Sequence, residues 1–107
     1  MGFDDFVRIG QKGTVINITV TRIQNGAEVP YDVSGTTTTT IEIQKPNGER
    51  LTPVIGVFIT DGVDGQITWK DTTGIFNVAG RWKARGIANF ASGDSFLGSW
   101  FGFAVDE

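Results

Sequence analysis

The chain has 107 residues, the size of one domain, and its 9 Lys and Arg against 12 Asp and Glu give a formal net charge of −3. This acidic balance argues against nucleic-acid binding through bulk positive charge. The lack of cysteine and histidine excludes disulfides, thiolate metal sites and the usual proton-transferring base. No apolar run is long enough to span a membrane, and no secretory signal opens the sequence, so we expect a product made in the cytosol.

The first nine residues precede the strand pattern of the rest of the chain and carry Phe3 and Phe6 around an acidic Asp-Asp pair. Such a segment could add a strand to the sheet of a neighbouring copy, with backbone hydrogen bonds for affinity and Phe side chains in pockets. It could equally form the first strand of its own sheet. The sequence leaves both roles open.

Alternation of apolar and polar residues predicts the next strand. In TVINITVTR (14–22), apolar residues at every second position alternate with Asn and Thr, which is the pattern of a half-buried strand. We interpret QNGAEVP (24–30) as the turn that follows, with Asn-Gly as its signal.

Five consecutive threonines (36–40) raise the question of a flexible linker. The odd positions of this run continue into two isoleucines, whereas the even positions continue into Glu and Gln. Thr is β-branched and favours strands, and a flexible linker would use Gly and Ser without alternation. We therefore predict one strand over 37–45 with its odd face inward, ended by the turn PNG (46–48).

Further strands and turns fill the second half of the chain. Each strand is indicated by period-two alternation or by a short apolar run between turn signals. The predicted order is strand 53–60, turn 61–65, strand 65–71, an irregular connection 71–80, strand 79–90, turn 91–94 and a last strand 95–105.

About seven short strands without a crossover helix indicate an all-β fold, an antiparallel immunoglobulin-like β-sandwich. We expect one sandwich domain at 10–107, preceded by the arm or first strand at 1–9. The cysteine pair of antibody domains is missing, so the likeness is architectural. The apolar phases of the strands predict one core between two sheets, made of Ile16, Ile18, Val20, Ile41, Ile43, Ile67, Trp69, Trp82, Phe101 and Phe103.

The order of these motifs resembles the immunoglobulin-like N-terminal domain of tailed-phage baseplate upper proteins. The matching stretches are GQKGTVINITV, YDVSG, IEIQKPNG, GRWKAR and the aromatic final strand GSWFGFAV, which together run from Gly10 to Val105. The turn residue Asn47 stands where Asp is usual, and Trp82 stands where Tyr is common. The resemblance implies a structural protein of the virion.

Nothing in the sequence points to catalysis. A nucleophile would have to be Ser or Thr, and no serine lies in a GxSxG turn. Asp61 and Asp64 are a close carboxylate pair, but DGVDG has the composition of a turn, so we interpret both as turn residues rather than as acid–base or calcium-binding groups. No phosphate-binding glycine motif is present. We expect no cofactor, no metal and no enzymatic activity.

Three cations share one face of the predicted strand 79–90. Arg81, Lys83 and Arg85 could simply be a solvated outer face that blunts edge pairing. They could instead form a salt-bridging face for an acidic neighbour, which would set register and association rate.

Aromatic residues crowd the last strand. On one continuous strand, Phe101 and Phe103 point one way and Phe96 and Trp100 point the other. Trp100 either covers neighbouring glycines within the monomer or is an exposed anchor for a partner. The predicted interface residues are Phe3, Phe6, Arg81, Lys83, Arg85, Phe96 and Trp100.

These patterns favour a non-enzymatic phage virion protein, a tail- or baseplate-associated assembly or attachment module that forms homo-oligomers and binds other virion structural proteins. The expected location is the virion, after synthesis in the host cytoplasm, with neither nucleic acid nor membrane as a partner. One alternative is a capsid decoration, head-fibre or neck protein. Another is a carbohydrate-binding adhesin that offers Trp69, Trp82 or Trp100 to a host-surface glycan.

Overall fold

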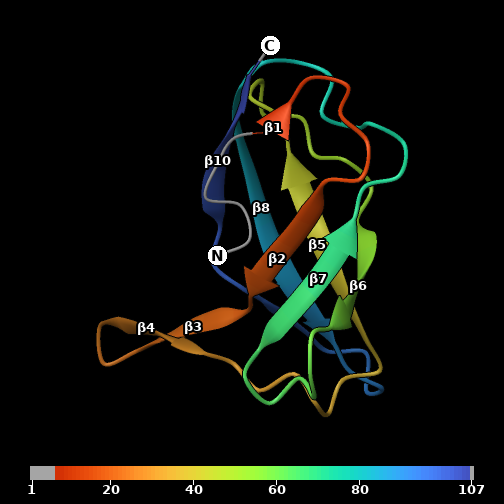
Figure 1. Cartoon of the computed structure of the whole chain (residues 1–107). Coiled ribbons are helices and arrows are strands. Elements are labelled where there is room, and N and C mark those ends of the chain that lie inside the picture. The colour runs from red at the N-terminus through yellow and green to blue at the C-terminus, as the bar shows by residue number, and fades with distance from the viewer. Residues whose placement is uncertain (1–6, 107) are drawn as a thin grey trace.

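The computed structural model describes residues 7–106, and every regular element in this range is a β-strand (Figure 1). Within these residues, no helix is long and apolar enough to cross a membrane. The strands are short because Gly, Asn and Asp interrupt the alternation every few residues. They are β1 (Val7–Arg8), β2 (Val15–Thr19), β3 (Thr21–Gln24), β4 (Ala27–Pro30), β5 (Thr38–Gln44), β6 (Val54–Phe58), β7 (Gln66–Lys70), β8 (Gly80–Asn89), β9 (Ser95–Leu97) and β10 (Phe101–Asp106).

Eight strands form one sheet in the order β1-β10-β8-β5-β6-β7-β2, with β9 paired to β8 beside this path. Neighbouring strands are antiparallel except for β1 and β10, which are parallel. The sheet curls so that β2 and β7 lie across β5 and β8 (Figure 1), and β2 contacts β8. The predicted all-β class is confirmed, as one compact domain of sandwich-like form.

Strand β6 makes the corner of the curled sheet, because its first part pairs with β5 and its last part with β7. Gly56 lies at this corner between the two layers, where a Cβ atom would stand 3.3 Å from side-chain atoms of Ile41 and Ile67. The Thr39 hydroxyl donates a hydrogen bond to the Gly56 carbonyl at 2.9 Å. A side chain at position 56 would therefore press on both layers.

One hydrophobic core fills the space between the layers. Burial is confirmed for eight of the ten predicted core residues, namely Ile16, Ile18, Val20, Ile41, Ile43, Ile67, Trp82 and Phe103. Trp69 and Phe101 are only half-buried and pack against this core. The buried apolar residues outside the prediction are Val7, Val33, Phe76, Ala84, Ala88 and Val105.

The threonine run is the start of a strand, as predicted. Strand β5 lies within the predicted range 37–45, and its inward residues Thr39, Ile41 and Ile43 are buried. The alternate residues Thr40 and Glu42 are partly exposed on the outer face. A flexible linker at this position is excluded.

The predicted final strand is interrupted by a β-bulge. Strands β9 and β10 both pair with β8, but between them residues 98–100 lie opposite only residues 85–86. The Gly98 amide still donates to the Gly86 carbonyl, at 2.8 Å. A Cβ atom on Gly98 would stand 2.9 Å from that carbonyl oxygen, so this approach requires glycine.

The bulge changes which way the aromatic residues face. One extra residue shifts the side-chain alternation, so Phe96 before the bulge and Phe101 after it both pack against the core. The expectation that they point to opposite faces of one strand is wrong for this reason.

The predicted strand 14–22 also divides. Strand β2 ends at Thr19, because the Val20 amide donates to the Gly65 carbonyl and the Val20 carbonyl accepts from the Tyr31 amide. The turn signal is confirmed, since Asn25 and Gly26 have φ of 53° and 80°, as a two-residue hairpin turn of type I′ requires.

Residues 27–30 form strand β4 rather than turn, which corrects the prediction for 24–30. Among the strands that the structure describes, β3 and β4 pair only with each other. Figure 1 shows this hairpin projecting sideways from the sandwich-like body.

The irregular connection 71–80 is held by a buried carboxylate that sequence reasoning missed. Asp71 is fully buried and accepts hydrogen bonds from the backbone amides of Thr73, Gly74 and Ile75 at 3.0 to 3.1 Å. Asp71 thereby folds the loop so that Phe76, which follows it, is fully buried in the core.

The N-terminal segment is described only from Val7. Strand β1 pairs in parallel with β10 of the same chain, with Val7 opposite Val105, and Val7 is buried. The Val7–Arg8 end of segment 1–9 therefore forms a strand in the sheet of its own chain. The predicted interface residues Phe3 and Phe6 lie outside the described residues.

We predict that Asp71→Asn lowers the free energy of unfolding by about 2–4 kcal/mol. The Asn side chain has one oxygen in place of two, and its amide group would face a backbone N–H that can no longer be paired. Urea denaturation followed by tryptophan fluorescence measures the change. Asp94→Asn, which makes the same substitution at an exposed turn, is the matched control. Equal stability of the two variants would show that the loop does not depend on Asp71.

Candidate interaction surface

The three predicted cations lie on the outer face of β8. Trp82 and Ala84 alternate with them and are buried in the core, so the two-residue period of the strand directs Arg81, Lys83 and Arg85 away from it. We call these three residues the cationic face.

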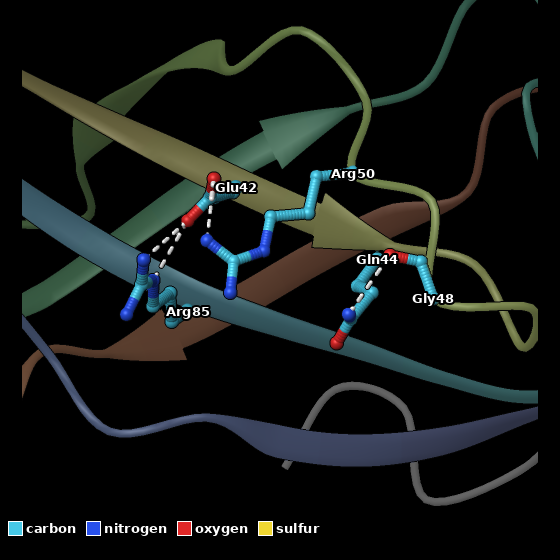
Figure 2. Close-up of polar contacts among 5 residues, drawn as sticks. All are labelled: Glu42, Gln44, Gly48, Arg50 and Arg85. Atoms are coloured by element: carbon cyan, nitrogen blue, oxygen red, sulfur yellow. Dashed lines mark hydrogen bonds and ion pairs between the residues drawn. The ribbon is translucent and has the colours of Figure 1, made fainter.

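Arg85 is held by a carboxylate on the neighbouring strand. Glu42 of β5 lies directly opposite Arg85, and its Oε1 accepts from Arg85 Nε at 2.8 Å and from Nη2 at 2.7 Å (Figure 2). Both side chains are only 14% exposed. Removal of Glu42 would leave the largely shielded Arg85 charge without its carboxylate partner, and removal of Arg85 would leave Glu42 with only the more distant Arg50.

Trp100 covers the same ion pair from the bulge. The guanidinium carbon of Arg85 lies 4.4 Å from the centroid of the Trp100 ring, and that of Arg50 lies 5.5 Å from it. Both distances are within the range of cation–π attraction. Trp100 is half-buried, so its ring is partly accessible beside the cationic face.

Arg50 reaches this cluster because the predicted PNG turn reverses the chain beside β5. Gly48 has a φ of 93°, and the Gln44 side chain donates to its carbonyl at 3.0 Å (Figure 2). The backbone of Arg50 then forms an isolated antiparallel β-bridge with Gln44, and Nη1 of Arg50 lies 3.9 Å from Oε2 of Glu42. With its side chain 54% exposed, Arg50 is a weaker partner of Glu42 than Arg85 is.

The other two cations of the face are exposed, and neither has an ion-pair or hydrogen-bond partner among residues 7–106. Lys83 lies between Gly102 of β10 and Gln44 of β5. The Arg81 guanidinium extends over Gly102, where a Cβ atom would stand 3.1 Å from Nη2. Gly102 has no side chain that could cover either cation, so both charges are open to a partner.

The remaining predicted interface residue, Phe96, lies elsewhere. Its ring stacks on Tyr31 with 4.0 Å between centroids and an interplanar angle of 12°, and it packs against the core.

The turn interpretation of the acidic pair is confirmed, because Asp61 accepts from the Val63 amide and Asp64 from the Gln66 amide, each at 3.0 Å.

Sequence reasoning missed Glu42 and Arg50 as members of the cluster. The alternation placed Glu42 on the outer face of β5, but only the register between β5 and β8 sets it opposite Arg85.

A second feature that sequence reasoning missed is the outward side of β6, where Ile55 and Val57 are 66% and 59% exposed. They border a groove of about 350 Å³ beside residues Thr36 to Thr39.

A scan against protein-family models and a search of curated proteins found no match to this chain.

We predict that Glu42 and Arg85 are energetically coupled. A double-mutant cycle with Glu42→Gln and Arg85→Gln should give an interaction energy of about 1–2 kcal/mol in urea denaturation, because both groups are shielded from solvent. The matched cycle with Arg50→Gln should give less than about 0.5 kcal/mol, because Arg50 is more exposed and more distant. Equal coupling in the two cycles would contradict the assignment of Arg85 as the principal partner.

Proposed function

We propose that the chain is a non-enzymatic structural protein of a phage virion, a tail- or baseplate-associated module that acts by self-association and docking. The sequence motifs that resemble the immunoglobulin-like domain of baseplate upper proteins support this proposal. The described chain adds two features suited to association: exposed cations without a partner and exposed apolar residues on β6.

We further propose that the sandwich is immunoglobulin-like. In that fold one sheet joins the third, sixth and seventh strands, and the other joins the second and fifth. With the β3–β4 hairpin set aside as an insertion, β5, β8 and β9–β10 occupy the first set of positions. Strands β2 and β7 occupy the second set, and β6 passes between the sheets. This strand order supports the finer assignment.

The observation that carries the proposed function is the open pair of cations, Arg81 and Lys83. Both stand on a strand that is paired on both sides, so their backbone positions are set before a partner arrives. An acidic segment would pair with both charges and gain register and association rate from them. The chain itself offers such a segment, because Asp4 and Asp5 stand next to Phe3 and Phe6. We propose that this segment of one copy docks on the cationic face of the next.

Charge reversal tests this docking. We predict that the paired change Arg81→Glu and Lys83→Glu lowers the mass of the assembled protein in light scattering. The two new Glu side chains would repel Asp4 and Asp5 of the neighbouring copy. Asp4→Lys with Asp5→Lys should do the same. A chain carrying all four changes should associate again, since the charges are complementary once more. The control pair Lys12→Glu and Lys70→Glu, which is exposed away from the cationic face, should leave the mass unchanged.

Deletion of residues 1–6 is the complementary test. It keeps Val7, which is buried in β1, so melting should stay nearly unchanged while the assembled mass falls. A monomeric parent protein would contradict the proposal, as would a four-fold variant that fails to associate.

A further inference from the structure

A second surface feature lies away from the exposed cations, at the open edge of the sheet. Strand β2 ends the sheet order, so no strand within residues 7–106 pairs with its outer edge. The base of the β3–β4 hairpin and the bulge before β10 both approach this edge. Together they enclose a pocket of about 280 Å³, lined by Asn17, Ile18, Thr19, Thr21, Glu28, Ser99, Trp100 and Phe101.

The pocket exists because of two departures from regular strand pairing. The hairpin supplies Thr21 and Glu28, and the bulge supplies Ser99 and Trp100. Continuous strands at either place would leave the β2 edge without these walls. The pocket is therefore a product of the same features that the alternation pattern did not predict.

The lining has the chemistry of a site for a neutral, hydroxyl-rich ligand. It offers one amide, three hydroxyls and one carboxylate, together with two aromatic side chains, and none of its residues is a cation. An anionic ligand would meet the Glu28 carboxylate, and no lining residue would offset that repulsion with a positive charge. A sugar ring, in contrast, has hydroxyls that pair with amide, hydroxyl and carboxylate groups, and C–H faces that pack on aromatic rings.

Two of these groups are held in place before a ligand binds. The Thr21 hydroxyl donates to Glu28 Oε1 at 2.8 Å, and within the described chain no donor is found for Oε2. Glu28 Oε2 can therefore accept a charge-assisted hydrogen bond from a ligand hydroxyl. Trp100 is fixed by the guanidinium groups of Arg85 and Arg50 beside its ring. Such fixed groups lower the entropy cost of binding.

We propose that this pocket binds one neutral pyranose ring, with Glu28 and Asn17 pairing its hydroxyls and Trp100 contacting its apolar side. The volume is near the lower end for ligand pockets, which suits a single ring rather than an oligosaccharide. This site is separate from the proposed assembly function, because neither Arg81 nor Lys83 lines the pocket.

Titration of the full chain with glucose, galactose, mannose, rhamnose and N-acetylglucosamine tests the proposal by amide NMR. At least one sugar should bind with a dissociation constant of about 1 mM or lower and shift the amides of the lining residues. Comparison of that sugar with its methyl glycoside distinguishes a site for chain-linked sugar, which binds both, from a site for free sugar alone. Absence of shifts with all five sugars, or shifts confined to other strands, would overturn the proposal.

The variant Glu28→Gln tests the role of the carboxylate. Its side-chain oxygen can still accept from Thr21, so the fold is retained, but the charge-assisted bond to the sugar is lost. The dissociation constant should rise by about fivefold or more. Glu49→Gln removes the same charge at an exposed turn outside the pocket and should bind like the parent protein. Unchanged binding by Glu28→Gln would overturn the assignment, whereas the assembled mass, measured in parallel, reports separately on the assembly proposal.

Discussion

The two-residue period of strand β8 is the constraint on which the rest of this structure depends. Its inward side chains become smaller from Trp82 to Gly86. Glycine is required at position 86 because a Cβ atom there would stand only 2.6 Å from a methyl group of Val20 in the opposite layer. Arg81 and Lys83 lie on the outward side of the same strand and are exposed to solvent. A slip of one residue would bury the cations and expose Trp82, so core and candidate interface are specified together.

The bulge beside β8 connects the two proposed activities. Residues 98–100 leave the regular ladder opposite residues 85–86. Trp100 consequently has two sets of neighbours. Its ring lies 4.4 Å from the guanidinium carbon of Arg85, and it also lines the pocket beside β2. The bulge thus places Trp100 both beside Arg85 of the cationic face and in the lining of the proposed ligand site.

Local sequence signals were sufficient where nearest neighbours decide the structure. The threonine strand and the Asn25-Gly26 turn depend on side-chain alternation and backbone preference, and both were predicted. The pairing of Glu42 with Arg85 joins residues 43 apart and depends on strand register, which alternation does not contain. The bulge and the buried Asp71 were missed because each depends on close backbone contacts, although the DTTG stretch is typical of a side-chain-capped turn.

Zero-length crosslinking between isotopically distinct copies tests most directly whether the outer face of β8 is the docking surface. A carbodiimide joins a carboxylate to an amine only where the two are in contact. In a mixture of ¹⁴N and ¹⁵N protein, Lys83 of one copy should crosslink to Asp4 or Asp5 of the other. Mixed crosslinks that involve Lys45 or Lys70 but never Lys83 would contradict the proposed docking on β8.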